Sequence, residues 1–241
     1  GIDFYVDMIS SIHKRFPKVH LQAFTAVEIS HFAEISGMTT HEILKRLKDA
    51  GLGSLPGGGA EVFSTAIREE LCPEKLSGDE WLNTMRTAHN LGLKSNATML
   101  YGHIETNEDR INHLLKLREL QDETGGFMSF IPLAFHPKNT DMENISSAAG
   151  ILDLKMLAIG RLMLDNFDHI KAFWIMLGIK ISQISLSFGV DDIDGTVAEE
   201  KITHSAGAET PEALTVDDIK SLIEETGREP VERDTLYNHM N

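Results

Sequence analysis

The chain has 241 residues, 41% of them hydrophobic, which suffices to bury the core of a single α/β domain. Its formal net charge of −15 opposes binding to nucleic-acid phosphates, and no basic stripe offsets that charge. No apolar run reaches the roughly 18 residues that a membrane helix needs, and no signal peptide is recognisable. The single cysteine suits a reducing compartment. We therefore expect a cytoplasmic protein without a nucleic-acid or membrane partner.

Strand and helix patterns alternate from the first residues onward. An amphipathic helix begins almost at Gly1, carries apolar residues at helical spacing and ends before Pro17. The run 19–25 then predicts the first strand, and a helix over 28–36 stops at Gly37. This order is the beginning of a strand–helix repeat.

The next two helices are marked by capping boxes, in which a hydroxyl and a carboxylate three residues apart satisfy free N–H groups of the first turn. The first box opens a helix that ends at Gly51, and the second opens one that ends at Gly92. Between them, a short strand carries Ser54 and Leu55 into a glycine turn. The boxes consist of Thr39 with Glu42 and Ser77 with Glu80.

The strand expected over 95–101 contains an uninterrupted, mostly apolar run of the kind that a sheet buried on both faces needs. Gly102 ends this strand, and Thr106 with Asp109 forms a weak capping pair for the helix that follows. The apolar stripe expected on that helix comprises Ile111, Leu114, Leu115, Leu117 and Leu120.

Three more strands and two more helices complete the pattern. A long apolar helix is expected over 151–164, and Thr215 caps a last helix that Gly227 ends. The three expected strands are 128–135, 171–177 and 190–193.

Six strands in a repeating strand–helix order favour a parallel α/β sheet curled into a barrel. Two strands in front would make eight, so we predict the last six units of a (β/α)8-type barrel over residues 1–209. Residues 210–241 then form a carboxyl-terminal extension packed on the barrel. Because parallel strands all end at the same edge of the sheet, the polar residues at their exits are the candidates for function.

The loop after the 95–101 strand carries a recognisable motif. Gly102 and Glu105, followed by acidic residues and Arg110, resemble the adenosine-contacting strand of radical S-adenosylmethionine enzymes. Three further stretches look like the aminofutalosine synthase (aminodeoxyfutalosine synthase) family, which acts in the futalosine route to menaquinone. These stretches are 55–61, 130–137 and 230–237. Several long motifs in the right order are far more specific than one glycine loop.

The resemblance implies a radical barrel that uses S-adenosylmethionine, a [4Fe-4S] cluster and an external electron donor. The implied reaction adds the 5′-deoxyadenosyl radical to the enol-ether double bond of 3-[(1-carboxyvinyl)oxy]benzoate, with decarboxylation to aminodeoxyfutalosine. A closed barrel suits this reaction because a primary carbon radical must be kept from solvent and held against one carbon. A cyclic dehypoxanthine futalosine synthase, a deazaflavin-cofactor synthase relative and a non-catalytic barrel fragment stay open as alternatives.

One feature of radical S-adenosylmethionine enzymes is missing. Their cluster is held by three cysteines of a Cys-x3-Cys-x2-Cys loop, whereas this chain has only Cys72. The helix that begins at Gly1 should in addition follow a strand. The sequence therefore predicts a carboxyl-terminal part of a longer enzyme, with the cluster ligands upstream of Gly1, and a chain that is inactive on its own.

The residues expected at the cofactor lie mostly at strand exits. Glu61 follows three glycines and could bond a ribose hydroxyl or an amine, although a tight turn with a surface glutamate is the plain alternative. Glu28 could meet the methionyl end of the cofactor or simply complement a helix dipole. Asn96 and Tyr101 either point into the barrel or satisfy core hydrogen bonds. The predicted cofactor-binding set is Glu28, Gly58, Glu61, Asn96, Tyr101, Gly102 and Glu105.

The implied small-molecule substrate carries two carboxylates and needs cationic or hydrogen-bonding partners. His136 precedes Pro137, which keeps the backbone extended and puts the imidazole at the barrel mouth. There it could hold a carboxylate or move a proton, which is the catalytic role we assign to it, or it is a half-exposed packed histidine. Arg110 and Arg233 are cationic candidates, and Arg233 is the weaker one because the tail could place it outside the site. The predicted substrate-binding set is His103, Arg110, His136, Asp192, Asp194 and His204.

No metal site is expected within the chain itself. The acidic run that contains Asp192 and Asp194 lacks the distal glutamate of an EF-hand. His103, His136 and His204 are not spaced as a zinc site, and no paired cysteine supports one.

Overall fold

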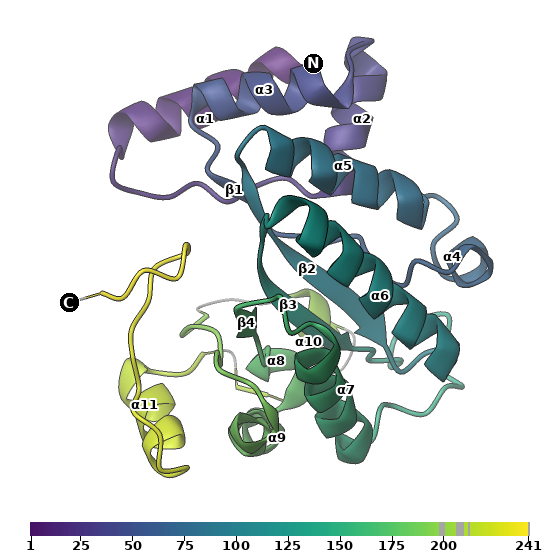
Figure 1. The fold of residues 1–241 in the computed structure, drawn as a ribbon, viewed down its shortest axis with the longest axis vertical. Helices are drawn as coiled ribbons and strands as arrows, with labels where there is room; N and C mark the ends of the chain where they lie inside the picture. Colours follow the sequence, from purple (N-terminus) through teal and green to yellow (C-terminus); the bar gives the residue numbers. More distant parts are fainter. Residues whose placement is uncertain (198–200, 206–209, 212, 241) are drawn as a thin grey trace.

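A parallel four-stranded sheet in the order β1-β2-β3-β4 forms the centre of the computed structural model (Figure 1). At least one helix separates each strand from the next along the chain, as parallel pairing requires. This confirms the parallel α/β fold. The strands are β1 Ser54–Leu55, β2 Lys94–Tyr101, β3 Phe127–Ala134 and β4 His169–Ile170. The structure describes residues 1–197, 201–205, 210–211 and 213–240.

Single parallel bridges extend the sheet by one position on each side. Gln22 pairs with Ser54 of β1, and Asp192 pairs with Lys171, which directly follows β4. Six parallel positions therefore stand side by side, in the order predicted from the sequence. The strands expected over 19–25 and 190–193 are correct in place but are reduced to one paired residue each.

The strand expected over 171–177 is wrong over most of its length. Only Lys171 pairs in the sheet, and Trp174–Leu177 forms the short helix α8. The indole N–H of Trp174 donates to the carbonyl oxygen of Gly195 at 2.9 Å, which anchors this helix beside the last strand position. A short apolar run reads alike in a buried strand and in a buried helix, so the pattern alone could not separate the two.

Local capping signals determine most of the longer helices. The predicted boxes at Thr39 and Ser77 form, and the caps predicted at Thr106 and Thr215 are full capping boxes as well. Thr25 makes a further box with Glu28. None of the described helices combines the length and apolar character needed to cross a membrane. The α-helices are α1 Ile2–Arg15, α2 Ala26–Ser36, α3 Thr40–Ala50, α4 Thr65–Leu71, α5 Gly78–Asn90, α6 Asn107–Thr124, α7 Gly150–Met163, α8 Trp174–Leu177, α9 Ile179–Ser185, α10 Ile202–Ser205 and α11 Val216–Glu224, and a 3-10 helix spans Leu186–Phe188.

The buried stripe of α6 differs from the predicted one. Ile111 and Leu115 are exposed, whereas Leu114, Leu117 and Leu120 are buried as expected. The buried face also includes Gln121, whose side chain accepts from the N–H of Phe127 at 2.8 Å and donates to its carbonyl oxygen at 3.1 Å. These hydrogen bonds to the first residue of β3 place a polar side chain in the core. The buried face of α6 is therefore rotated relative to the predicted apolar stripe.

The two faces of β2 have different surroundings. The Tyr101 hydroxyl donates to Oδ1 of Asp153 on α7 at 2.7 Å, and the Ser95 hydroxyl lies 2.9 Å from Nε2 of His89 on α5. These residues therefore face the helices, and because side chains alternate along a strand, Asn96 faces the opposite side. The predicted site residues Asn96 and Tyr101 consequently lie on opposite faces of the sheet.

Two buried histidines make the stability of this fold sensitive to acid. Burial lowers the pKa of His89 to about 4 and that of His113 to about 3. The folded protein keeps both rings neutral, whereas the unfolded chain protonates them below about pH 6.5. The free energy of unfolding should therefore be at its full value above that pH and decrease toward pH 4, by roughly 3 kcal/mol for each histidine. Urea unfolding at a series of pH values measures this decrease.

A His89→Asn variant should lose part of this pH dependence, because it lacks one of the buried rings whose pKa burial lowers. His31→Asn is the matched control, since the side chain of His31 is 62% exposed. If wild type and both variants show the same pH dependence, burial of His89 does not contribute to acid sensitivity.

Candidate functional site

The loop after β2 is organised around Glu105, whose side chain is fully buried. Its Oε1 accepts from the N–H of Gly102 at 2.6 Å and from Nε of Arg110 at 2.7 Å, and its Oε2 accepts from the N–H of His103 at 2.8 Å. Burial opposes ionisation of this carboxyl, but these donors outweigh it and lower the pKa of Glu105. Both oxygens are used inside the loop, and the contact of Glu105 with a cofactor stays a prediction.

The imidazole of His103 is buried in the same loop. The N–H of Ile104 donates to Nδ1 at 2.8 Å, so Nδ1 carries no proton, and Nε2–H donates to the carbonyl oxygen of Leu100 at 3.1 Å. Burial lowers the pKa of His103, in agreement with a neutral ring. The structure thus brings His103, Arg110 and Glu105 together, but each uses its polar atoms within the loop.

The glycine loop 57–61 follows β1 and passes close to β2. A Cβ atom on Gly57 would stand 2.1 Å from the carbonyl oxygen of Asn96, so only glycine fits there. Glu61 has a φ angle of 46°, which is costly for a residue with a side chain, and backbone strain of this kind clusters at functional sites. Its Oε1 accepts from Nζ of Lys75 at 2.9 Å, and its side chain is 16% exposed. Among the described contacts Oε2 has no partner and is available to a ligand that donates hydrogen bonds.

Arg68 on α4 is a residue of this region that sequence reasoning missed. Its exposed fraction is 4%, and its guanidinium lies against the glycine loop, where it donates to main-chain carbonyl oxygens. No pattern in the sequence signals such a role, because an arginine fits on the surface of almost any helix. Only the packing of α4 against the loop reveals it.

Other predicted cofactor contacts serve local structure in the fold. Glu28 is exposed, and its Oε2 accepts from the N–H and the hydroxyl of Thr25 at 2.8 and 2.9 Å, which is the geometry of a capping box. Oδ1 of Asn96 accepts from the Ser129 hydroxyl at 2.9 Å. The carbonyl oxygen of Gly58 accepts from the indole N–H of Trp81 at 3.1 Å. Each of these groups is thus used within the fold itself. The contact of Glu28, Asn96 and Gly58 with a cofactor stays a prediction.

His136 lies two residues beyond β3, at the same edge of the sheet as the Glu105 loop. The register aligns Tyr101 with Ala134, and the N–H of Phe135 donates to the Tyr101 carbonyl oxygen at 2.8 Å. Nε2–H of His136 donates to the carbonyl oxygen of Met176 at 2.9 Å, which fixes the ring. Within the described residues Nδ1 has no hydrogen-bond partner, so it is the nitrogen left for a ligand or a proton.

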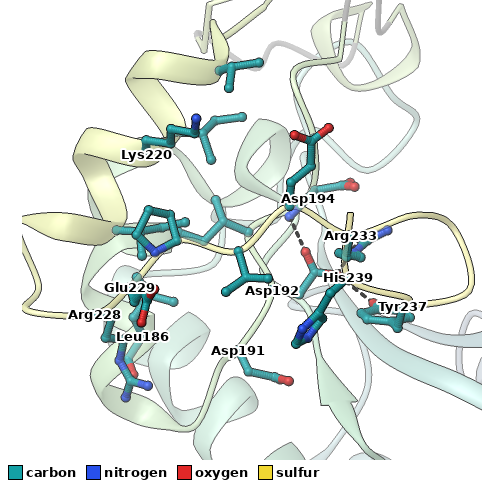
Figure 2. Close-up of a pocket in the computed structure, with 18 of the residues that line it drawn as sticks. Leu186, Asp191, Asp192, Asp194, Lys220, Arg228, Glu229, Arg233, Tyr237 and His239 are labelled. Atoms are coloured by element: carbon teal, nitrogen blue, oxygen red, sulfur yellow. Dashed lines mark hydrogen bonds and ion pairs between the residues drawn. The ribbon is translucent and has the colours of Figure 1, made fainter. Parts of the chain in front are cut away.

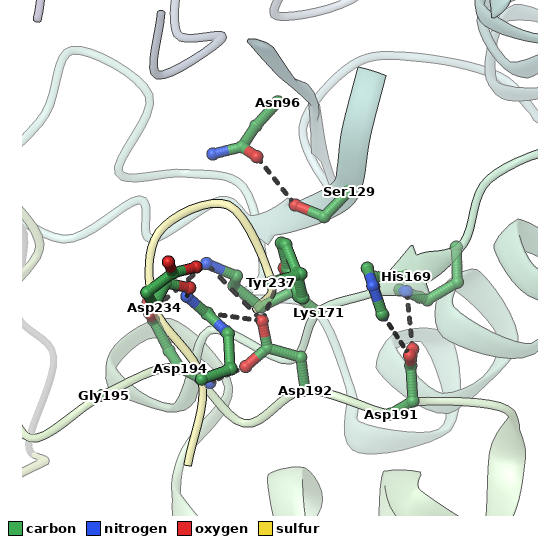
Figure 3. Close-up of polar contacts among 12 residues, drawn as sticks. Asn96, Ser129, His169, Lys171, Asp191, Asp192, Asp194, Gly195, Asp234 and Tyr237 are labelled. Atoms are coloured by element: carbon green, nitrogen blue, oxygen red, sulfur yellow. Dashed lines mark hydrogen bonds and ion pairs between the residues drawn. The ribbon is translucent and has the colours of Figure 1, made fainter. Parts of the chain in front are cut away.

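Asp192 is the centre of a cluster of polar contacts between the last strand position and the tail of the chain (Figure 3). Its Oδ2 accepts from Nη2 of Arg233 and from the Tyr237 hydroxyl, both at 2.6 Å, and lies 3.8 Å from Nζ of Lys171. Burial opposes ionisation, but Lys171, Arg233 and Tyr237 outweigh it and lower the pKa of Asp192. Asp192 therefore binds the tail in this structure, and its contact with a substrate stays a prediction.

The ring of Tyr237 is stacked between two partners. The imidazole of His169 is nearly parallel to it at a centroid distance of 3.8 Å, and Cζ of Arg233 lies 4.3 Å from the centroid of the Tyr237 ring. Two groups this close must occupy opposite faces of the ring. Arg233, the weaker cationic candidate, is thus engaged by Asp192 and Tyr237.

A cavity of about 770 Å³ lies beside this cluster, between α11 and residues 191–196 (Figure 2). Asp192 and Asp194 border it, whereas Glu61, Glu105 and His136 do not. The predicted site residues therefore fall into two groups, one at the strand exits and one beside the tail. His204 belongs to α10, but its side chain lies outside the described part of the structure.

The residues of this chain do not fit a [4Fe-4S] cluster. Cys72 is the only cysteine, and burial raises the pKa of its thiol, which disfavours the thiolate that binds iron. Across the described ranges, no three His, Cys, Asp or Glu side chains are grouped so that they could hold a metal ion. An S-adenosylmethionine ligand is a different case, because the free oxygen of Glu61 can accept from a hydroxyl or an ammonium group.

The arrangement of strands and helices matches a known enzyme structure. Methylornithine synthase superposes with a TM-score of 0.67 over 95% of this chain and 64% of its own, at 17% sequence identity. The chain thus has the α/β barrel fold of that enzyme. Its own polar site residues follow the carboxyl ends of the strands, where active sites of such barrels lie.

Sequence comparisons identify the family within this class. A model of the CofH/MqnC C-terminal region matches residues 124–241. The chain is 48% identical over 241 residues to aminodeoxyfutalosine synthase of Thermus thermophilus, covering 98% of this chain and 65% of the relative. It is 43% identical over 239 residues to the 5-amino-6-(D-ribitylamino)uracil--L-tyrosine 4-hydroxyphenyl transferase of Archaeoglobus fulgidus, covering 98% and 70%.

The chain therefore belongs to the family that contains the aminodeoxyfutalosine synthases and these 4-hydroxyphenyl transferases. This confirms the resemblance seen in the motifs. The chain spans about two thirds of the length of the curated relatives it matches, 65% in the case of the Thermus thermophilus enzyme.

Removing the charge of Asp192 should detach the tail from the sheet. An Asp192→Asn substitution leaves Lys171 and Arg233 without their shared carboxylate partner, and we expect it to lower the free energy of unfolding by about 3 kcal/mol. Asp194→Asn is the matched control, because asparagine tolerates its φ angle of 61° and, among the described residues, Asp194 forms one ion pair, with Lys171 at 3.4 Å. We expect a change below about 1 kcal/mol there.

Urea unfolding of wild type and the two variants measures the difference. Equal destabilisation by both substitutions would show that Asp192 is not the centre of the tail contact.

Proposed function

We propose that this chain supplies the greater part of the cofactor- and substrate-binding barrel of an aminodeoxyfutalosine synthase. The observation that carries the proposal is the 48% identity to the Thermus thermophilus enzyme over 98% of the chain. The motifs 55–61 and 130–137, on which the resemblance rests, contain Glu61 and His136, and both side chains lie at strand exits with one polar atom free of protein partners in the described residues.

The proposed reaction of the whole protein joins the adenosyl group of S-adenosylmethionine to 3-[(1-carboxyvinyl)oxy]benzoate, with loss of carbon dioxide, to give aminodeoxyfutalosine. S-adenosylmethionine and a [4Fe-4S] cluster are the proposed cofactors, and an external electron donor is the proposed partner. Because the only cysteine of this chain is buried, we propose that the cluster ligands lie outside it.

The chain's own residues would bind and orient the reactants. Glu61 offers an acceptor for a hydroxyl or ammonium group of the cofactor at the exit of β1. His136 would hold or move a proton at Nδ1, since Nε2 is committed to the Met176 carbonyl oxygen. The Glu105–Arg110 pair keeps the loop after β2 in one conformation, and the positioning of reactants by such rigid loops lowers the entropic part of a barrier.

A second candidate is the activity named for the archaeal relatives, the transfer of a 4-hydroxyphenyl group from L-tyrosine to 5-amino-6-(D-ribitylamino)uracil. The observation in its favour is the 43% identity and the greater share, 70%, of the Archaeoglobus fulgidus relative that the chain covers. The two reactions differ in every substrate except the shared cofactor, so a product assay separates them.

A protein that contains this chain together with a cluster-binding segment should convert the enol-ether substrate to aminodeoxyfutalosine when it is reconstituted with iron and sulfide and supplied with a reductant. Mass spectrometry of the product is the measurement. The control is this chain alone, which should show no cluster absorbance and no cleavage of S-adenosylmethionine. Formation of the 4-hydroxyphenyl adduct instead would assign the second candidate.

In the same protein, a His136→Gln substitution should raise the KM for the enol-ether substrate about tenfold, which corresponds to the loss of one charge-assisted hydrogen bond of roughly 1.5 kcal/mol. Glutamine can still donate to the Met176 carbonyl oxygen, so the fold should be preserved. Steady-state kinetics give KM and kcat separately. His31→Gln, at an exposed histidine on α2, should leave both constants unchanged, and an unchanged KM in His136→Gln would remove His136 from the site.

A further inference from the structure

The guanidinium of Arg68 is a buried cation without a carboxylate partner in the described part of the chain. Its Nε donates to the carbonyl oxygen of Leu76 at 2.7 Å, and its remaining bonds go to the loop that follows β1. Burying a charge is costly unless its hydrogen-bonding capacity is satisfied, and main-chain carbonyl oxygens satisfy it here. The loop acceptors are the carbonyl oxygens of Ala60 at 2.5 Å, Val62 at 3.3 Å and Gly59 at 3.3 Å.

The other carbonyl oxygens of this loop are also bound by the protein. The Thr98 hydroxyl donates to Gly57 at 2.8 Å, and the N–H of Leu100 donates to Glu61 at 2.9 Å. With the indole of Trp81 on Gly58, all six successive carbonyl oxygens from 57 to 62 accept from donors in α4, α5 or β2. The backbone of residues 57–62 is therefore held in a single shape from behind, and Arg68 supplies three of its anchors.

The consequence of this shape is the placement of Glu61. Its φ angle of 46° costs free energy that the surrounding hydrogen bonds must offset. Its carbonyl oxygen accepts from the N–H of Leu100, so Glu61 lies beside the end of β2 in the loop that follows β1. Lys75 occupies Oε1 only.

We propose that Arg68 is a positioning residue that fixes the 57–62 loop and, through it, the carboxylate of Glu61 toward a ligand that presents hydrogen-bond donors. Ribose hydroxyls and an ammonium group are the donors of S-adenosylmethionine that match this chemistry. The inference rests on the proposed function for the identity of the ligand. The role of Arg68 itself rests on the carbonyl contacts.

The test uses Arg68→Lys, which keeps the charge but loses the planar fork that reaches several carbonyl oxygens at once. Arg86→Lys is the matched control, because Arg86 is a partly exposed arginine that pairs with Glu123 on α6. Hydrogen exchange of this chain should show faster exchange of amides 57–62 in Arg68→Lys and no change there in Arg86→Lys. Isothermal titration with S-adenosylhomocysteine, the non-reactive probe, should give about a tenfold weaker Kd in Arg68→Lys.

A double-mutant cycle separates positioning from plain stabilisation. If Arg68 acts through Glu61, Glu61→Gln should weaken binding of S-adenosylhomocysteine at least as much as Arg68→Lys does. The Kd of the double variant should then lie within about twofold of the Kd of Glu61→Gln. Effects that multiply, or a Kd unchanged in folded Arg68→Lys, would overturn the inference. Should Arg68→Lys fail to fold, Arg68→Gln, which keeps N–H donors without the charge, takes its place in the same cycle, and coupling to Glu61 or its absence decides the question.

The result is distinguishable from a failure of the proposed function. Coupling between Arg68 and Glu61 without formation of aminodeoxyfutalosine would retain the inference and reject that function. Formation of aminodeoxyfutalosine without coupling between Arg68 and Glu61 would support that function and reject the inference. If the wild-type chain and the reconstituted protein both fail to bind S-adenosylhomocysteine, the inference is overturned.

Discussion

The parallel pairing of β2 with β3 is the constraint on which the arrangement of the candidate site depends. The register runs from Ser95 opposite Phe127 to Tyr101 opposite Ala134, so both strands end at the same level. The loop around Glu105 and the His136 segment therefore emerge side by side, and the N–H of Leu100 near the end of β2 donates to the carbonyl oxygen of Glu61. The ladder between β2 and β3 places the first two of these loops, and the separate bond from Leu100 places the third beside them. A shift of the β2–β3 register would move the His136 segment away from the other two.

The parts of the fold that sequence predicts well are those determined by local contacts. The boxes at Thr39 and Ser77 need only residues three positions apart, and they form as expected. The strand expected over 171–177 and the stripe through Ile111 fail for the opposite reason, since each depends on partners far away in the chain. Tertiary contacts of Trp174 with Gly195 and of Gln121 with Phe127 determine those two outcomes, and no short window contains both partners.

The candidate site shows the same limit in another form. Residue type and spacing correctly place Glu61, Glu105 and His136 at strand exits, because the end of a strand is a local signal. Whether such a side chain is free to bind a ligand depends on its neighbours. Glu105 is bound by the N–H groups of its own loop and by Arg110. Among the described contacts Glu61 has only Lys75 as a side-chain partner, and the N–H groups of Arg68 go to main-chain carbonyl oxygens instead. Which carboxylate oxygens have hydrogen-bond partners is decided by the folded structure and not by residue type or spacing.

The two groups of polar residues also differ in what their charges do. Beside the tail, Lys171 and Arg233 face Asp192 closely enough to neutralise it, so this cluster joins two parts of the chain and leaves little net charge for a ligand. In the described part of the chain, the buried guanidinium of Arg68 donates to main-chain carbonyl oxygens and to no carboxylate. The strand exits therefore keep an acceptor ready for a donor-rich ligand, while the contacts around Asp192 hold the tail on the sheet.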